Sequence, residues 1–352
     1  MSTASGYAAA AAKAPLGPFT FQRRELRPND VSIKILYCGV CHSDIHQARD
    51  EWGGGMFPMV PGHEIVGRVT AVGGAVKKFK PGDIAGVGCL VDSCMQCDNC
   101  RAGFQQHCER GASLTYNGRE QGTGAPTYGG YSDHIVVREE FTLRITHQEK
   151  HLAAVAPLLC AGITTYNPLR RWGVGPGKRA GVVGLGGLGH MALKLAHSMG
   201  AEVVQFTSSR SKVEDALRLG ANRVVLSSDA AAMAAERNRF DFILDTVSAP
   251  HDMNAYLSLL RREGAMTVVG VPEKPMQIAA FSLILGDRVL AGSAIGGLPA
   301  TQEMLDYCAT HDIVSDVEVI PIQHINAAYE RVVKSDVKYR FVIDLASLGT
   351  RG

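Results

Sequence analysis

The feature that most constrains the fold of this chain is a glycine-rich turn near its middle. Residues 184–189 read Gly-Leu-Gly-Gly-Leu-Gly, after the apolar stretch 180–183 and before a stretch with helical periodicity. In that setting the glycines permit a tight turn and a close approach to a pyrophosphate group, which lies at the positive end of the helix. Glycine is abundant, with 39 among 352 residues, so the pattern alone is weak and a merely structural turn is the alternative. The strand before it and the helix after it favour a dinucleotide site formed by Gly184, Leu185, Gly186, Gly187, Leu188 and Gly189.

Strands and helices alternate around this turn. We expect strands at 180–183, 202–207, 223–226, 240–246 and 265–269, and helices at 188–199, 211–219, 230–237 and 253–260. This alternation predicts a parallel sheet with helices on both faces. Past Gly292 the alternation weakens, with helices expected at 301–310 and 325–333 and strands at 317–320 and 340–343.

The part of the chain before about residue 150 has a different sequence pattern. Short β-branched runs at 31–38, 65–72, 83–87 and 135–137 are separated by Pro-Gly or Gly-Gly turns, and no long amphipathic helix is evident. This pattern predicts a β-rich, partly open barrel or sandwich. The alanine-rich start, Met1 to Ala14, carries Lys13 as its only charge and lacks the pattern of a signal peptide, so we expect a loosely ordered leader.

Charge and hydropathy exclude several classes of protein. The chain has 36 basic and 34 acidic residues, a net charge of +2, which predicts no surface for nucleic acid or anionic lipid. No apolar run approaches the roughly 20 residues that span a bilayer, and the best, 152–163, contains Pro157. A membrane protein and a secreted protein are disfavoured, and a cytoplasmic location is expected.

Four of the nine cysteines fall within fifteen residues: Cys94, Cys97, Cys100 and Cys108. Four thiolates at this spacing can close a tetrahedral zinc site that cross-links a loop of low intrinsic structure. The alternative is a [4Fe–4S] cluster, but the ferredoxin pattern has three residues before its last cysteine and a proline after it. Here the gap is seven residues and Glu109 follows, so structural zinc is preferred, with His107 only a neighbour.

A second group of metal-binding residue types is spread along the chain. It comprises the stretch 39–46, Gly-Val-Cys-His-Ser-Asp-Ile-His, the triplet Gly62-His63-Glu64, and Cys160. Two thiolates and an imidazole from separate segments form a zinc site with an open fourth position. The simpler reading of Cys160, in an apolar run, is a packing cysteine. Cys38 and Cys41 also form a C-x-x-C pair, but without the setting of a redox motif.

The strand expected at 202–207 bears on the choice of nicotinamide cofactor. An NAD site needs an acidic residue about 20 positions after the first glycine, where it binds the ribose 2′-hydroxyl. This chain has no acid there, but has Thr207, Ser208, Ser209, Arg210 and Lys212. Hydroxyl groups and cations suit a 2′-phosphate and therefore NADP(H). The alternative is a solvated basic loop that begins a helix.

Together these motifs resemble the zinc-dependent medium-chain alcohol dehydrogenases, and specifically the cinnamyl-alcohol-dehydrogenase-like, broad-range NADPH aldehyde reductases of bacteria. The resemblance rests on residues 39–44, 60–64, the four-cysteine loop, 159–166 and 184–189, and it runs from about Pro28 to Ile343. It implies a GroES-like, partly open barrel as the zinc-binding catalytic domain, at 1–161 and 295–352. Between these segments, at 162–294, it implies a doubly wound parallel Rossmann sheet, so that the chain is α/β in class.

Roles for single residues also follow from the resemblance. It implies catalytic zinc on Cys41, His63 and Cys160, and hence two zinc ions per chain. Asp44 would accept a hydrogen bond from His63, fixing its tautomer, and Glu64 would approach the metal when water leaves.

The same resemblance implies a path for the proton and a seat for the cofactor. Ser43 would hydrogen-bond the substrate oxygen and pass its proton through the nicotinamide ribose towards His46. Thr164 would help to seat the nicotinamide. Trp52, Met56 and Phe57 could line an apolar substrate pocket, although ordinary core packing explains them equally well.

The function that these expectations describe is hydride transfer between NADP(H) and an aldehyde or primary alcohol, with a broad aliphatic and aromatic range. Family members are often homodimers, but nothing in the sequence fixes the oligomeric state. A zinc-free quinone reductase is excluded by the three ligands Cys41, His63 and Cys160. The alternative from another class is a non-catalytic zinc- and nucleotide-binding protein, which should carry one zinc ion rather than two.

Overall fold

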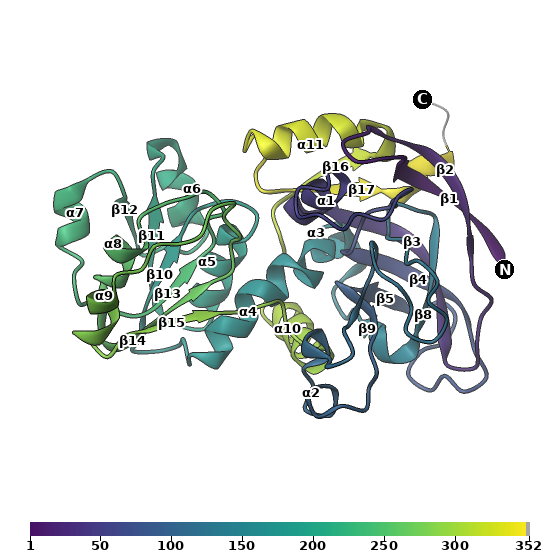
Figure 1. Cartoon of the computed structure of the whole chain (residues 1–352), viewed down its shortest axis with the longest axis horizontal. Coiled ribbons are helices and arrows are strands. Elements are labelled where there is room, and N and C mark those ends of the chain that lie inside the picture. The colour runs from purple at the N-terminus through teal and green to yellow at the C-terminus, as the bar shows by residue number, and fades with distance from the viewer. Residues whose placement is uncertain (350–352) are drawn as a thin grey trace. The chain divides into compact units, whose positions relative to one another are not determined.

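The computed structural model describes residues 1–349, and these divide into two compact units by their internal contacts (Figure 1). Unit 1 comprises Met1–Cys160 together with the chain from Gly296 onward, and unit 2 is Ala161–Ile295. Each unit is described below by itself.

Unit 2 is built on a six-stranded sheet in which every neighbouring pair is parallel. The strands, in sheet order, are β12 (Arg223–Leu226), β11 (Glu202–Thr207), β10 (Arg179–Val183), β13 (Phe240–Asp245), β14 (Leu260–Val268) and β15 (Val289–Gly292). The order reverses direction at β10, so the turn after β10 lies at a topological switch point, where open parallel sheets bind their ligands.

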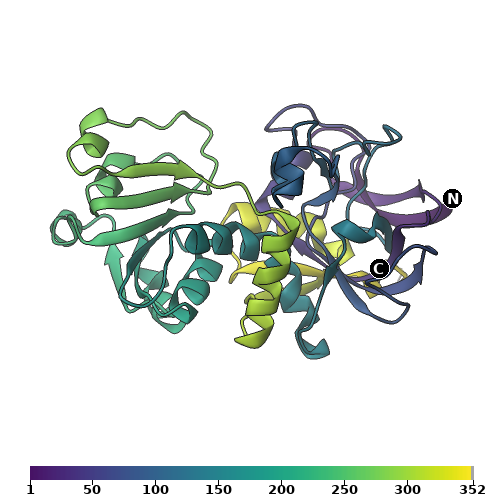
Figure 2. The ribbon, with the colours of Figure 1, turned by 90° about the horizontal axis from the view of Figure 1, so that it is seen from below.

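Helices lie on both faces of this sheet, as Figure 2 shows. They are α4 (Ala161–Arg171), α5 (Gly189–Ser198), α6 (Val213–Arg218), α7 (Ala230–Ala234), α8 (Met253–Leu257) and α9 (Ala280–Ile284). The core beneath them includes Val204, Phe206, Phe240, Ile243 and Leu260, which come from the β-branched and aromatic runs of the strands. The predicted doubly wound α/β fold is confirmed.

Unit 1 is organised around the long strand β3 (Asp30–Val40), which belongs to a seven-stranded, mainly antiparallel sheet. Two register shifts in its pairing with β4 bend β3, as irregularities in a ladder do. Its companions are β4 (Ile65–Val72), β5 (Ile84–Val87), β8 (His134–Arg138), β9 (Leu143–Arg144), β16 (Val317–Pro321) and β17 (Arg340–Asp344). The predicted β-rich, GroES-like unit is confirmed.

Short elements complete unit 1. They are α1 (His42–Ala48), β6 (Leu90–Asp92), α2 (Asp98–Arg101), β7 (Ser113–Leu114), α3 (Leu152–Val155), α10 (Leu298–Thr310) and α11 (Ile325–Val333). A 3₁₀ turn, Ala156–Leu159, leads into Cys160.

The alanine-rich start of the chain is not the loosely ordered leader that we expected. It forms β1 (Ser2–Ala9), which pairs in antiparallel register with β2 (Leu16–Arg23). Ala9 and Met59 exchange two backbone hydrogen bonds of 2.9 Å, and Ala4, Ala8 and Ala9 are buried. Alanine has little strand propensity of its own, but its small side chain lets β1 lie close against its neighbours, and this tertiary packing decides the structure.

Several expected elements differ from the structure in length. The expected helix 211–219 is a 3₁₀ turn, Arg210–Lys212, followed by the shorter α6, and the helices expected at 230–237 and 253–260 end early, as α7 and α8. Among residues 1–349, no single helix is long and apolar enough to cross a membrane, and one broken pair, Glu149–Leu159 with Ala161–Arg171, passes that test by length and composition only.

Candidate metal centres and cofactor site

The first candidate metal centre lies in unit 1, where three segments converge. Cys41 follows the end of β3, His63 and Glu64 precede β4, and Cys160 follows the 3₁₀ turn Ala156–Leu159. The pairing of Cys38 with Ile65, and a 2.9 Å hydrogen bond from Gly39 N to Glu64 O, hold the first two segments side by side. One ligand atom from each of these four residues lies within 4.8 Å of the others, and all four residues are buried.

The sulfur separation fits a zinc ion. Two sulfurs about 2.3 Å from a tetrahedral zinc are about 3.8 Å apart, and Cys41 Sγ and Cys160 Sγ are separated by 3.9 Å. The hydrogen bond between these sulfurs lowers the pKa of Cys41 well below the usual thiol range and raises the pKa of Cys160. A bound dication would favour the thiolate form of both cysteines, so that both sulfurs become ligands.

Glu64 lies next to this cluster in an ion pair that sequence reasoning missed. Burial raises the pKa of Glu64 to about 8, against the opposing charge of Arg340. Arg340 Nη2 donates to Glu64 Oε1, while Glu64 Oε2 has no hydrogen-bond partner. Room for this carboxylate depends on Gly39, where a Cβ atom would lie 1.9 Å from Glu64 Oε2. The antiparallel pairing of Phe341 with Val40 brings Arg340 here from the last strand, and no local pattern around Arg340 marks it.

Asp44 is brought together with His63 by the start of α1. As the third residue of the helix, Asp44 accepts through Oδ2 from Cys41 N, at 2.8 Å, which satisfies one of the free N–H groups at a helix start. Its Oδ1 lies 3.0 Å from His63 Nδ1 and accepts from Gly62 N at 3.2 Å. This geometry leaves His63 Nε2 as the ring nitrogen able to bind a metal.

The second candidate metal centre is the loop between β6 and β7. The sulfurs of Cys94, Cys97, Cys100 and Cys108 lie within 4.8 Å of one another, and the Cys94–Cys100 separation is 3.9 Å. Main-chain N–H groups point at the sulfurs: Cys97 N lies 3.4 Å from Cys94 Sγ, and Cys94 N lies 3.4 Å from Cys108 Sγ. Within residues 1–349 no acidic or imidazole side chain joins these four sulfurs, and this donor set suits a closed, structural zinc site.

The glycine turn of unit 2 has room for a dinucleotide. Gly184 has φ +88°, and a Cβ at Gly189 would lie 2.2 Å from Gly184 O, so the turn itself requires both glycines. A Cβ at Gly186 would meet nothing within 4 Å, so the space beside it is open to a ligand. The first residues of α5 have no side-chain cap, which leaves N–H groups for a pyrophosphate.

The segment after β11 lies beside this turn. Lys212 Nζ donates to Leu185 O at 2.8 Å, and Ser209 N donates to Thr207 Oγ1 at 3.2 Å. Ser208 and Arg210 are exposed, while Thr207 is buried. The structure therefore places Lys212, expected at the 2′-phosphate, against Leu185 of the turn expected at the pyrophosphate. Thr164, on α4, is buried.

Comparison with known proteins gives the family. Residues 27–147 match the alcohol dehydrogenase GroES-like domain, and residues 187–310 match the zinc-binding dehydrogenase domain. Aldehyde reductase YahK of Escherichia coli is 57% identical over 338 residues, which is 96% of this chain and 97% of that protein. NADP-dependent alcohol dehydrogenase C 1 of Mycolicibacterium smegmatis is 54% identical over 349 residues, 99% of each. This chain belongs to the zinc-binding alcohol dehydrogenase family.

Solved structures of the alcohol dehydrogenase family agree with this assignment. A cinnamyl alcohol dehydrogenase of Sorghum bicolor aligns with a TM-score of 0.95, at 46% identity, over 99% of each chain. A protein titled CAD from Helicobacter pylori, complexed with NADP(H), aligns with a TM-score of 0.91, at 40% identity, over 98% of each chain.

The exposed side of α1 carries the remaining residues that the family resemblance singles out. Ser43 and His46 are both half-buried and are three residues apart, so they share a face of the helix. The His46 ring stacks between His42 and Trp52, with both centroid distances 4.8 Å, and its Nδ1 contacts Glu51. Trp52 is 46% exposed, and Met56 and Phe57 are half-buried. The substrate pocket that we expect from Trp52, Met56 and Phe57 stays a prediction.

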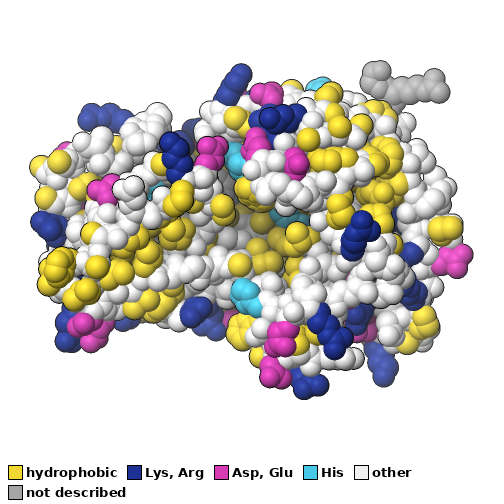
Figure 3. Space-filling view, viewed as in Figure 1, with side chains coloured by type: hydrophobic (Ala, Val, Ile, Leu, Met, Phe, Trp, Pro, Cys, Tyr) yellow, Lys and Arg dark blue, Asp and Glu magenta, His cyan; other side chains and the backbone are white. Residues whose placement is uncertain are grey.

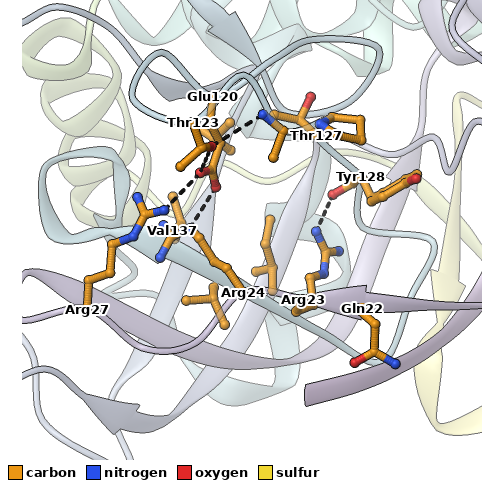
Figure 4. A pocket seen from close by; sticks show the side chains of 14 residues that line it. Gln22, Arg23, Arg24, Arg27, Glu120, Thr123, Thr127, Tyr128 and Val137 are labelled. Carbon is orange, nitrogen blue, oxygen red and sulfur yellow. Dashed lines mark hydrogen bonds and ion pairs between the residues drawn. The ribbon is translucent and has the colours of Figure 1, made fainter. Parts of the chain in front are cut away.

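A cavity of 170 Å³ elsewhere in unit 1 is not part of the dehydrogenase site. Figure 4 shows that Arg23, Arg24 and Arg27 point towards it, together with Glu120. Arg24 and Arg27 are paired with Glu120, and Arg23 donates to the main-chain oxygens of Tyr128 and Gly129. Burial lowers the pKa of Arg23 to about 9. Because the guanidinium groups already have acceptors, we assign no anion to this cavity.

Proposed function

We propose that this zinc-type, NADP(H)-dependent oxidoreductase reduces aldehydes of broad aliphatic and aromatic range to primary alcohols. The observation that carries the proposal is the buried cluster of Cys41, His63 and Cys160, with its 3.9 Å sulfur separation. Three protein ligands leave the fourth position of a zinc ion open for a substrate oxygen. The relative named aldehyde reductase supports this direction of reaction, and the relative named NADP-dependent alcohol dehydrogenase supports the alcohol–aldehyde pair and the cofactor.

In this proposal the two units have different roles. Residues 1–161 and 295–352 form the catalytic domain with both zinc sites, and residues 162–294 form the dinucleotide-binding domain. Nine free cysteines, six of them proposed as zinc ligands, suit a reducing compartment, so we infer a cytoplasmic location.

When bound, zinc supplies a Lewis acid for the carbonyl oxygen and NADPH supplies the hydride. The residues of the chain hold and orient these groups. Asp44 accepts the Nδ1 proton of His63, so that Nε2 keeps its lone pair for the metal. Ser43 would donate a hydrogen bond to the substrate oxygen and pass its proton to that oxygen as the alcohol forms, and His46, three residues along α1, would supply the replacement proton. The exposed edge of His46 allows exchange with water, because its side chain is 20% exposed.

Cofactor choice is assigned to the segment after β11. Arg210 and Lys212 are cationic and the Ser209 and Ser211 hydroxyls lie 2.7 Å apart, so they can surround a 2′-phosphate. No carboxylate stands where NAD would need one.

The test measures cofactor oxidation with an aromatic aldehyde, first with NADPH and then with NADH. We expect fast loss of NADPH only, and Arg210→Ala should raise the KM for NADPH about tenfold or more, since a hydrogen bond to a charged group contributes about 1.5–3 kcal/mol. The matched control is Arg262→Ala, which removes an exposed cation elsewhere in unit 2 and should leave this KM unchanged.

A preference for NADH would overturn the cofactor assignment alone. If protein that holds two zinc ions oxidises neither cofactor, the proposed substrate class is wrong and the non-catalytic alternative is reopened.

We also infer a homodimer, formed through the edge strand β15. Apolar side chains with high exposure gather on and just before this strand: Phe281 is 70% exposed, Ile284 63% and Leu285 79%. Figure 3 shows hydrophobic side chains gathered over α9 and β15. An open edge with an apolar border pairs readily with another strand, and a second copy of β15 can meet it about a two-fold axis.

Sedimentation tests this inference. The wild-type protein should sediment at twice the chain mass of 37.6 kDa, and Leu285→Glu should sediment as a monomer. Leu217→Glu alters another exposed leucine, on α6, and should stay dimeric. A dimer that withstands Leu285→Glu would place the interface elsewhere.

A further inference from the structure

Asp44 is a buried carboxylate with four hydrogen-bond donors at 2.8–3.2 Å, and the Tyr116 hydroxyl also faces it. Its exposure is 0%, and three of the donors, Cys41 N, Gly62 N and the His63 ring, belong to the two segments that carry zinc ligands. The fourth is the hydroxyl of Tyr131, which donates to Asp44 Oδ2 at 3.1 Å. Tyr131 comes from a separate segment, just before β8, and is itself 0% exposed.

We propose that Tyr131 is a positioning residue for the zinc ligand His63 and acts through Asp44. The inference rests on the proposed function, because it assumes that His63 binds the catalytic zinc. The Tyr131 hydroxyl fixes one oxygen of Asp44, and the other oxygen then meets His63 Nδ1 at a set angle. A carboxylate that orients a histidine ligand tunes both the direction and the basicity of the other ring nitrogen.

The main chain anchors Tyr131 against the segment that it would position. Tyr131 N donates to Pro61 O at 3.0 Å, and Gly130 N donates to Gly62 O at 2.8 Å. On its other side, Tyr131 O accepts from Tyr7 N of β1 at 2.9 Å. The phenol is therefore attached to a short ladder that ends directly beside His63.

Close packing of the ring removes the remaining freedom. A Cβ atom at Gly62 would lie 2.7 Å from Tyr131 Cδ1, and Gly62 has φ +104°, so the ring touches the main chain of the residue before His63. The Tyr116 ring stacks on His63 from another segment, with a centroid distance of 5.8 Å. Tyr131 is thus placed to act through its hydroxyl, and its ring is a separate packing element.

The hydroxyl matters because the Asp44 carboxylate is fully buried. The four donors at 2.8–3.2 Å are main-chain N–H, imidazole and phenol groups. Removing one donor from a buried charged group lowers the stability of the folded protein. Without the Tyr131 hydroxyl, Oδ2 loses its donor at 3.1 Å, and Asp44 is freer to rotate away from His63.

The experiment compares holoenzyme carrying Tyr131→Phe with wild type. The first measurement is the rate at which catalytic zinc passes to a chromophoric chelator, and Cys160→Ser, which should lack that zinc, identifies its phase. We expect about threefold to tenfold faster release, at or below the 10–100-fold range for groups that touch a metal ligand directly. The second measurement is the visible spectrum of the cobalt(II)-substituted enzyme, whose bands should shift because the histidine direction changes.

The matched control is Tyr256→Phe, which removes another buried phenol hydroxyl, in unit 2. It should change neither the release rate nor the cobalt spectrum. In an Asp44→Asn background, Tyr131→Phe should have little further effect, because both changes interrupt one chain of hydrogen bonds.

Unchanged zinc release and an unchanged cobalt spectrum in Tyr131→Phe would overturn the inference and leave the proposed function intact. Wild-type protein that binds no zinc at this cluster would overturn both. If Tyr131→Phe does not fold, 3-fluorotyrosine at position 131 keeps the ring and makes the hydroxyl a stronger donor. Slower zinc release is then expected, and release at the wild-type rate would contradict the proposal.

Discussion

The two cysteine clusters of unit 1 use the same ligand chemistry in opposite ways. The loop cluster takes its sulfurs from one stretch, 94–108, and Cys94 and Cys97 are only half-buried. The catalytic cluster takes its ligands from three distant segments, and every member is buried. The loop cluster cross-links a single loop that has little hydrophobic core of its own. The catalytic cluster, by contrast, forms only after β3, β4 and the turn before Cys160 have packed together.

Electrostatics separate the clusters further. Main-chain N–H groups of Gln96 and Cys97 lower the pKa of Cys94, while burial raises the pKa of Cys100 to about 12. Around the catalytic cluster, the charges of Glu64, Arg340 and Asp44 lie in the interior. A closed zinc site with four thiolates needs little more than backbone N–H donors to its sulfurs. A zinc site with an open coordination position also needs nearby charged side chains that can adjust when a ligand binds.

The largest expected effect comes from Cys160→Ser. Zinc content should fall from two ions per chain to one, and turnover should fall by about 10³-fold or more, since the metal contributes several kcal/mol of charge stabilisation. Metal analysis and steady-state rates with NADPH check this.

Cys97→Ser is the matched change in the other cluster. It should also remove one zinc ion, but the main result should be a lower melting temperature, with the KM for aldehyde unchanged in protein that stays folded. Equal loss of turnover in both variants would abolish the distinction between a catalytic and a structural cluster.

Arg340→Leu tests the charged surrounding of the catalytic cluster. Breaking a buried ion pair costs about 3–5 kcal/mol, and we expect the lower end because Glu64 can take up a proton. Thermal unfolding should show the loss, while zinc in the four-cysteine loop is retained. Arg68→Leu removes a guanidinium from an exposed pair with Glu149 and should cost at most about 1 kcal/mol. Equal costs for these two variants would contradict a special role for the interior pair.

The smallest expected effect is that of Ser93→Ala, which acts on the loop cluster only. The Ser93 hydroxyl is 3.3 Å from Cys100 Sγ, and the residue is 2% exposed. Its loss should cost about 1 kcal/mol and speed zinc release from the loop severalfold, with no change in KM. Ser32→Ala, in β3, removes a hydroxyl bonded to Thr70 and is the control. A raised KM for aldehyde in Ser93→Ala would show that the two clusters are coupled, and would contradict an effect confined to the loop cluster.

The elements predicted most accurately are those whose pattern is local. The expected strands 65–72, 202–207 and 223–226 and the helix 325–333 coincide with β4, β11, β12 and α11. Dense β-branched residues, or apolar residues at helical spacing, decide such segments before tertiary packing does. The helix α4 was not predicted, since it contains Pro168, and β15 was not predicted either.

The candidate site divides in the same way. The spacing of four cysteines was enough to predict the loop cluster. The glycine turn was predicted from its own sequence together with the strand before it and the helix after it. The catalytic cluster was assembled only with the help of the family resemblance, since 119 residues separate Cys41 from Cys160. Arg340 and Tyr131 were missed, because their roles depend on the β17–β3 register and on the ladder between 59–62 and 129–131.

The hairpin of β1 and β2 has a practical consequence. The composition of its alanine-rich strand suggests a segment that could be removed or replaced with a tag. The main chain of this strand, however, is hydrogen-bonded to Met59 through Ala9 and to Tyr131 through Tyr7. Shortening the first nine residues would therefore loosen the backbone that leads to His63, far away in sequence.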